Sequence, residues 1–114
     1  MNLKQFLSND SLRNAWLDEP NMKVYVRRSI RYLADIPNLS PCLDIASIEV
    51  DEDHRGNGVF TAFLDRFEQE AKKLNRVVFV ESILEPRLYQ YLLTRGYTDV
   101  PGTCEMSPCV FKIV

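Results

Sequence analysis

The chain has 114 residues, of which 46% are hydrophobic and 26% are charged, a balance that suits one globular domain over residues 1–114. The 14 Lys and Arg are offset by 16 Asp and Glu, giving a formal net charge of -2. No basic field therefore covers the chain, and we expect no nucleic-acid partner. No stretch reaches the roughly 20 apolar residues that cross a bilayer, and the N-terminus lacks the apolar run of a secretory leader. We expect a cytoplasmic protein without a membrane partner.

The cysteines indicate neither a disulfide framework nor a zinc site. Their number is odd, and the spacing of Cys42, Cys104 and Cys109 matches no paired CxxC pattern. Cys109 stands beside the apolar Val110 and Phe111, which favours a core position over a nucleophile. We expect buried or half-buried thiols and no metal.

The first half of the chain changes from a helical to an extended pattern. Apolar residues within 3–17 have the spacing of one or two short helices, and residues 19–21 break the chain. Residues 22–34 alternate with period two, which predicts an amphipathic strand. After a turn at 37–41, residues 42–50 read as a strand with apolar residues on both faces, which is typical of the middle of a sheet. We expect Leu43 and Ile45 on one face, and Ala46, Ile48 and Val50 on the other.

The second half predicts two helices that alternate with strands. A helix over 59–74 carries one apolar stripe, and 77–82 reads as a short buried strand. A second helix begins at Glu85-Pro86 and ends at Gly96, and 109–113 closes the chain as a strand. The predicted fold is α/β, with a mixed, mostly antiparallel central sheet flanked by helices.

Two glycines mark the segment with the clearest chemistry. Gly56 and Gly58 lie between the buried strand and the start of the helix over 59–74. A helix N-terminus presents unpaired N–H groups and positive partial charge, and glycines let that backbone approach a ligand. Arg55 adds a donor fork suited to phosphate oxygens. A plain turn with a surface arginine has the same composition, and the residues alone leave both interpretations open.

Two longer segments resemble a known family. Residues 48–60 resemble motif A of the GCN5-related N-acetyltransferase (GNAT) superfamily, where Arg55 and Gly58 match the signature and Phe60 departs from it. Residues 80–97 are similar to motif B, which ends in a helix, a glycine and an aromatic residue. The resemblance implies the acyltransferase fold of that family, acetyl-CoA as co-substrate, and transfer of an acetyl group to a primary amine.

Carried over position by position, the resemblance also implies a cofactor site. Backbone groups of motif A would hold the pyrophosphate, and the strand before it would pair with the pantetheine arm. Glu85 stands where relatives often have an asparagine that touches that arm. The implied cofactor-binding residues are Ile48, Val50, Arg55, Gly56, Asn57, Gly58, Val59, Phe60 and Glu85.

Acyl transfer also needs a group that takes the proton of the amine and an acid for the departing thiolate. Glu49, on the central strand, is the first candidate base, with an ion pair to Arg28 as its alternative role. Glu81, at the end of the next strand, is the second candidate base. Tyr89 is the candidate acid, although relatives place a tyrosine where Leu92 stands here. We expect His54 near the pyrophosphate and not at the thioester.

Two functions remain open on the sequence. The first is an N-acetyltransferase with a small-molecule or protein amine as acceptor. The alternative is a catalytically reduced module that binds acyl-CoA or a protein partner without turnover, which Phe60 and Leu92 favour. The small size of the chain is also consistent with a homodimer, which we add as a prediction.

Overall fold

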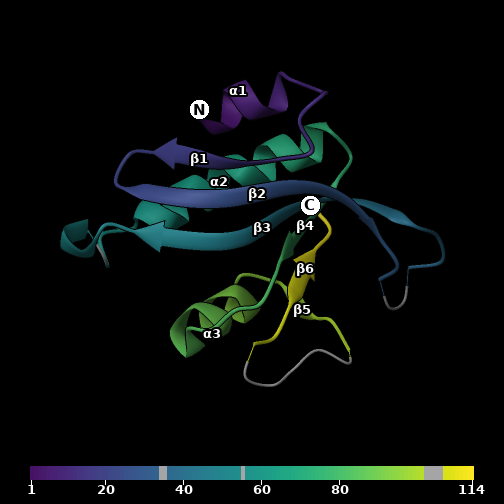
Figure 1. Cartoon of the computed structure of the whole chain (residues 1–114). Helices are drawn as coiled ribbons and strands as arrows, with labels where there is room; N and C mark the ends of the chain where they lie inside the picture. The colour runs from purple at the N-terminus through teal and green to yellow at the C-terminus, as the bar shows by residue number, and fades with distance from the viewer. Residues whose placement is uncertain (34–35, 55, 102–106) are drawn as a thin grey trace.

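The computed structural model describes residues 1–33, 36–54, 56–101 and 107–114. Within them the chain forms one six-stranded sheet with helices packed against it (Figure 1). The elements in chain order are α1 (Leu3–Leu7), β1 (Asn14–Glu19), β2 (Met22–Arg31), β3 (Ser40–Val50), the short 3-10 helix η1 (Glu52–His54), α2 (Val59–Lys73), β4 (Val77–Val80), α3 (Pro86–Thr94), β5 (Thr98–Asp99) and β6 (Val110–Lys112).

The sheet is mixed and mostly antiparallel, as the sequence predicts. Its strand order is β1-β2-β3-β4-β6-β5. Only the pair β3 and β4 is parallel among the pairings of the described strands, and α2 forms the connection between them. A parallel pair needs a crossover connection of this kind, so the strand-helix-strand pattern of the sequence fixes this part of the topology.

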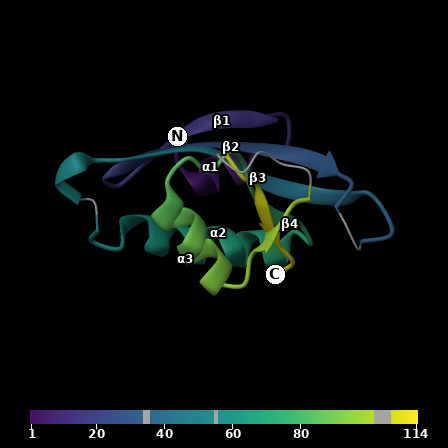
Figure 2. The same ribbon diagram turned by 90° about the horizontal axis from the view of Figure 1, so that it is seen from below.

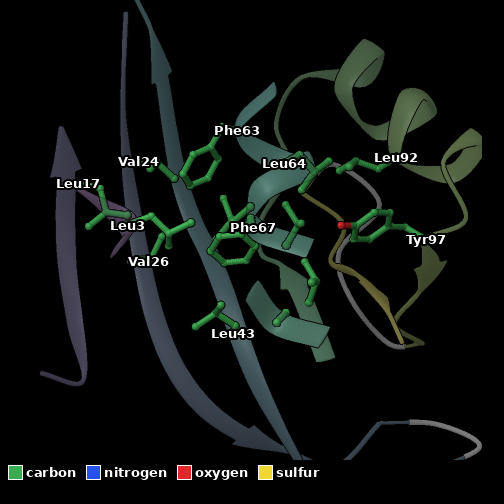
Figure 3. Close-up of a cluster of buried hydrophobic side chains, with 14 of the residues drawn as sticks. Leu3, Leu17, Val24, Val26, Leu43, Phe63, Leu64, Phe67, Leu92 and Tyr97 are labelled. Carbon is green, nitrogen blue, oxygen red and sulfur yellow. The ribbon is translucent and has the colours of Figure 1, made fainter. Parts of the chain in front are cut away.

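The helices α1, α2 and α3 lie on the same side of β1, β2 and β3 (Figure 2). Their apolar side chains meet the inner face of the sheet in one buried cluster (Figure 3). Phe63 and Phe67 of α2 are fully buried at its centre, and Leu92 of α3 closes one end. The cluster includes Leu3, Phe6, Leu17, Val24, Val26, Leu43, Ile45, Leu64, Ala71, Val78, Val80 and Tyr97.

The structure corrects the prediction for residues 3–17. Only Leu3–Leu7 is helical, capped by Asn2, and the segment that begins at Asn14 is strand β1. Leu17 points into the core while Trp16 points away from it, which is period-two alternation and not a helical stripe. The tight turn at Pro20 and Asn21, where Asn21 has φ of 64°, joins β1 to β2 as a hairpin. The hairpin pairing outweighs the local helical spacing.

The face assignment of the central strand is also wrong from Ala46 onward. The register changes there: Val26 faces Ile45 and Tyr25 faces Ser47, so Ala46 is an extra residue in β3. This β-bulge resets the alternation. Ile48 and Val50 consequently pack on the same core as Leu43 and Ile45, and not on the opposite face.

The two longer helices match their predictions. α2 spans Val59–Lys73, and Leu74, placed at the end of its stripe, is 45% exposed. Glu85 caps the N-terminus of α3, and Gly96 follows this helix in the left-handed region, with φ of 101°. No helix among the described residues is both long and apolar enough to cross a membrane. Cys42 is buried and Cys109 half-buried, and Cys104 lies outside the described residues.

Candidate active site

A gap opens in the middle of the sheet where β3 and β4 separate. Their parallel pairing ends at Ile45 and Val80, and the amide of Glu81 makes one further bond to the Ile45 carbonyl at 3.0 Å. β3 then continues to Val50, whereas the chain after Glu81 turns toward α3. The bulge at Ala46 sits at this point and bends β3 away from its neighbour.

The gap holds a cavity, here called the strand-gap cavity, of about 330 Å³. One wall is β3 around the bulge, and the other is the segment that leads from β4 into α3. Ser82 in that segment has φ of 50°, which is uncommon for a residue with a side chain and marks a constrained backbone. The lining residues are Ile45, Ala46, Ser47, Ile48, Val80, Glu81, Ser82, Ile83, Leu84, Glu85 and Leu88.

A second cavity of about 470 Å³, here called the loop cavity, lies at the N-terminus of α2. It shares Ile48, Glu85 and Leu88 with the strand-gap cavity. The two hollows therefore adjoin, and together they lead from the start of a helix to the opening in the sheet. The other residues that line the loop cavity are Val50, His54, Gly56, Gly58, Val59, Phe60 and Thr61.

The two glycines of the loop cavity suit its backbone conformation. Gly56 and Gly58 have φ of 82° and 76°, a left-handed conformation that a side chain disfavours. Gly58 is the N-cap of α2 and supplies no side-chain cap, so the first amides of the helix keep their donors for another partner. A Cβ added at either glycine would meet nothing within 4 Å and would project into open space. The cradle therefore has room for a ligand.

His54 supplies a second feature that fits an incoming group. Its Nδ1 is buried and has no hydrogen-bond partner among the described residues, although the side chain lines the loop cavity. A buried polar atom without a partner is costly, and a ligand in the cavity would satisfy it. The expectation that His54 lies near the phosphates stays a prediction. Arg55, the predicted phosphate ligand, lies outside the described residues.

The remaining predicted cofactor residues divide into two groups. Ile48, Val50 and Val59 are half-buried and line the loop cavity, while the exposed Asn57 does not. Phe60 is half-buried and contacts both the cavity and the core, so it belongs to the apolar stripe of α2 as well. The described part of the segment predicted from the sequence thus lines a cavity except at Asn57, and its role in binding the cofactor stays a prediction.

The second candidate base, Glu81, lies in the strand-gap cavity within an ion-pair network. Its carboxylate pairs with Arg27 and lies 3.9 Å from Arg31. The same two arginines hold Asp44, which is fully buried on β3, at 3.1 and 2.8 Å, and Ser29 donates to Asp44 at 2.8 Å. The arginines therefore fix the Glu81 side chain at the edge of the gap.

The first candidate, Glu49, is exposed on the face of the sheet that the helices leave uncovered. It stands opposite Lys23 and forms no ion pair within the part of the chain that the structure describes. Its predicted alternative partner, Arg28, lies elsewhere. The Arg28 guanidinium instead donates to carbonyls that include those of Phe6 and Leu7 at the end of α1. Glu49 does not line either cavity.

Two side chains near α3 have structural partners. The Tyr89 hydroxyl donates to the Asp99 carboxylate at 2.7 Å, and this hydrogen bond raises the pKa of Tyr89. Tyr89 lines neither of the two cavities. Glu85 lines both of them and also accepts from the Arg87 amide at 3.0 Å as the cap of α3. The capping bond gives this carboxylate a role of its own at the position where relatives often have asparagine.

Sequence reasoning missed the network around Asp44. The pattern that could have found it is an aspartate inside an otherwise apolar strand, together with arginines at alternate positions of the preceding strand. A fully buried carboxylate needs charged partners, and alternate residues of the neighbouring strand share its face. Arg27 and Arg31 on β2 meet that requirement.

Comparison with known proteins identifies the fold. No protein-family model matches the chain, and no curated protein matches its sequence. Solved structures do match: a histone acetyltransferase HPA2 and related acetyltransferase from Corynebacterium glutamicum has a TM-score of 0.57 at 14% identity, over 94% of this chain and 67% of that one. The KacTA–DNA complex matches with a TM-score of 0.59 at 16% identity, over 80% of this chain and 57% of that one. The chain has the GNAT fold.

AtaT, another neighbour, was solved in two informative complexes. One structure holds acetyl-CoA and the C-terminus of the antitoxin AtaR, with a TM-score of 0.54 at 14% identity over 80% of this chain and 57% of that one. The other holds acetyl-methionyl-tRNAfMet, with a TM-score of 0.60 at 13% identity over 85% of this chain and 66% of that one. This chain thus spans little more than half of the matched chains in the KacTA–DNA complex and in AtaT bound to AtaR and acetyl-CoA.

These neighbours correct one expectation. The small net charge was taken to exclude nucleic-acid partners, but proteins of the same fold were solved with DNA and with an acylated tRNA. The net charge of the whole chain therefore does not tell whether a protein of this fold binds nucleic acid. A local surface can bind nucleic acid whatever the net charge of the molecule.

Proposed function

We propose that the protein transfers an acetyl group from acetyl-CoA to a primary amine. The observation that carries this proposal is the pair of adjoining cavities, which connects a glycine-lined helix N-terminus to a gap in the sheet with Glu81 at its edge. The phosphate groups of acetyl-CoA need the helix N-terminus, and the reacting thioester needs the gap in the sheet. The acetyl-CoA in the AtaT structure supports the same assignment.

The loop cavity would take the phosphate end of the cofactor. The first amides of α2 and the buried Nδ1 of His54 provide polar contacts for it, and the positive end of the helix favours an anion. Ile48 and Leu88 line the passage toward the gap and suit the less polar arm. The Phe60 side chain takes up part of the cavity, so the contact at this position comes from its backbone.

The strand-gap cavity would hold the reacting atoms. The amine nitrogen attacks the thioester carbonyl carbon, a C–N bond forms, and the C–S bond breaks as the tetrahedral intermediate collapses. The nitrogen loses one proton to a carboxylate, and the thiolate of CoA takes one from water. Glu81 lines this cavity and is our proposed base, acting directly or through a bound water, with Glu49 as the second candidate.

Isothermal titration with acetyl-CoA tests the cofactor site. Gly58→Trp should abolish binding, because the new side chain projects into the loop cavity. The positive φ of Gly58 strains any side chain, so Gly58→Asn is the matched control, since asparagine tolerates this conformation and is small. Micromolar binding by the wild type that survives in Gly58→Asn, and is lost in folded Gly58→Trp, supports the proposal. Absence of binding to the wild type at millimolar acetyl-CoA would overturn it.

A second candidate function is cofactor or partner binding without turnover. The Phe60 side chain in the loop cavity and the Asp99 partner of Tyr89 favour it. An acceptor screen separates the two candidates. Because AtaT was solved with acetyl-methionyl-tRNAfMet, an aminoacyl-tRNA belongs in that screen beside small amines and peptides. Tight acetyl-CoA binding without turnover of any acceptor would favour the binding module.

A further inference from the structure

A cavity where β4 begins brings three arginines together. It has a volume of about 270 Å³ and is here called the arginine cavity. The segment after α1, the C-terminal part of β2 and the turn between α2 and β4 meet there, at the same end of the sheet (Figure 1). The charged residues that line it are Asp10, Arg13, Arg28 and Arg76. Each arginine thus comes from a different segment of the chain.

The arginine cavity is separate from both cavities of the candidate active site. None of its described lining residues lines either of them. Arg76 follows the C-terminus of α2, whereas the loop cavity lies at the N-terminus of this helix. α2 has 15 residues, and a rise of about 1.5 Å per residue places its two ends about 20 Å apart. A group bound in the arginine cavity is therefore not the one proposed for the loop cavity.

Arg28 and Arg76 differ from the other partly buried cations of the molecule. Both are half-buried, and neither forms an ion pair within the part of the chain that the structure describes. The other half-buried Lys and Arg of the described residues each pair with a carboxylate, namely Arg27, Arg31, Arg95 and Lys112. Partly buried charges are normally paired, because losing water costs free energy. Two such charges without a carboxylate in one cavity indicate a place for an external anion.

The two guanidinium groups have different roles in the cavity. The terminal nitrogens of Arg28 donate to main-chain carbonyls that include those of Phe6 and Leu7, which fixes its charge in place. Arg76 donates from Nη1 to the Cys42 carbonyl at 2.9 Å, and its other N–H groups have no partner among the described residues. Burial, and then the nearby charge of Arg76, lower the pKa of Arg28. An anion in the cavity would offset this repulsion and accept from the free donors of Arg76.

We propose that the arginine cavity binds a phosphate group. Its lining side chains carry three positive charges and one negative charge, a net formal charge of +2 that matches a doubly ionised phosphate. Arginines from three segments surround the cavity, and a tetrahedral phosphate presents acceptor oxygens in several directions, whereas a carboxylate is planar. The group belongs either to a small phosphorylated molecule or to a nucleic-acid backbone. This site is independent of the proposed transferase activity.

Thermal unfolding with inorganic phosphate tests the site, with chloride at equal ionic strength as the reference. A ligand that binds only the folded protein raises its melting temperature. We expect this rise in the wild type, and about tenfold weaker phosphate binding in Arg76→Gln, which loses a charge and free donors. Arg87→Gln is the matched control, since it removes the same charge from an exposed position outside the cavity. No rise in the wild type, or an equal loss in both variants, would overturn the proposal.

Two further variants isolate the arginine cavity. Phosphate can also enter the loop cavity, so the titration is repeated in Gly58→Trp, whose side chain projects into that cavity. The phosphate effect should persist there, and its disappearance would overturn the proposal. Arg13 is exposed, so Arg13→Gln should fold normally and also weaken phosphate binding, which tests the site even where Arg76→Gln is unstable. Acetyl-CoA should bind Arg76→Gln as tightly as the wild type, so the two proposals fail separately.

Competition experiments distinguish the sources of the phosphate group. A labelled single-stranded oligonucleotide that binds more tightly than inorganic phosphate, and is lost in Arg76→Gln, would identify a nucleic-acid backbone. Oligonucleotide binding that Arg76→Gln leaves unchanged, beside a phosphate effect that this variant removes, would identify a small phosphorylated molecule. Succinate offers two carboxylates in place of the phosphate. Binding of succinate as tight as that of phosphate would overturn the assignment to phosphate.

Discussion

The Glu81 amide donates to the Ile45 carbonyl at 3.0 Å, and this bond is the last one between β3 and β4. Immediately beyond it, the extra residue Ala46 bends β3 away and the strand-gap cavity begins. The backbone bond therefore anchors Glu81 at the edge of the gap, while Arg27 fixes its side chain. A carboxylate held from both ends in this way has a fixed position at the edge of the gap.

Glu81→Gln should lower kcat by about 10² and leave acetyl-CoA binding unchanged, because a carboxamide cannot accept the proton of the amine. Glu49→Gln is the matched control, since Glu49 is exposed and does not line the cavity. Steady-state kinetics and isothermal titration of both variants make the measurement. A larger loss of kcat in Glu49→Gln would transfer the role of base to Glu49, the first candidate from the sequence.

Tyr89→Phe should leave kcat close to the wild-type value. Its hydroxyl is bound to Asp99 and lies outside both cavities, and the raised pKa makes it a weaker proton donor. The sequence-based prediction of a catalytic acid requires the opposite result, a fall in kcat of about tenfold or more. Single-turnover kinetics of acetyl transfer distinguishes the two outcomes.

Asp44→Asn should lower the free energy of unfolding by about 3 kcal/mol, because it leaves two half-buried arginines without a fully buried anion between them. Urea denaturation measures the loss. Asp18→Asn is the control: its side chain is 72% exposed and its contact with the N-terminus is 3.8 Å long, so we expect almost no change. Equal stability of Asp44→Asn and the wild type would contradict a structural role for the network.

The ionisation of Glu68 makes the free energy of unfolding depend on pH. Burial alone would raise its pKa, but hydrogen bonds from Arg95 at 2.9 Å and Tyr97 at 2.7 Å outweigh burial and lower it. A carboxylate with a lowered folded-state pKa stabilises the fold above its unfolded pKa of about 4.3, and this contribution is lost as the pH falls through the folded-state value.

The difference in unfolding free energy between the wild type and Glu68→Gln should therefore be about 2 kcal/mol at neutral pH and shrink in acid. Urea denaturation at a series of pH values measures it. Glu70→Gln, which removes an exposed pair with Lys73, should show almost no difference at any pH. A difference for Glu68→Gln that stays constant into acid would show that the carboxylate charge is not what stabilises the fold.

The sequence by itself determined the parts of the molecule that depend on local patterns. The apolar stripe of Phe63, Leu64 and Phe67 predicts α2, and Glu85-Pro86 and Gly96 bracket α3, because caps and helical spacing act within a few residues. The resemblance around Gly56 and Gly58 also indicated the segment that forms the loop cavity, since a left-handed backbone favours glycine.

Only the tertiary structure decided the features that join distant segments. β1 is a strand because it pairs with β2, although its local spacing suits a helix. The bulge at Ala46 becomes visible when both neighbouring strands are in place, and it moves Ile48 and Val50 to the core face. The gap and the Arg27 contact of Glu81 likewise arise from register between strands. Register is a pairing property of two chain segments, so one segment's pattern cannot specify it.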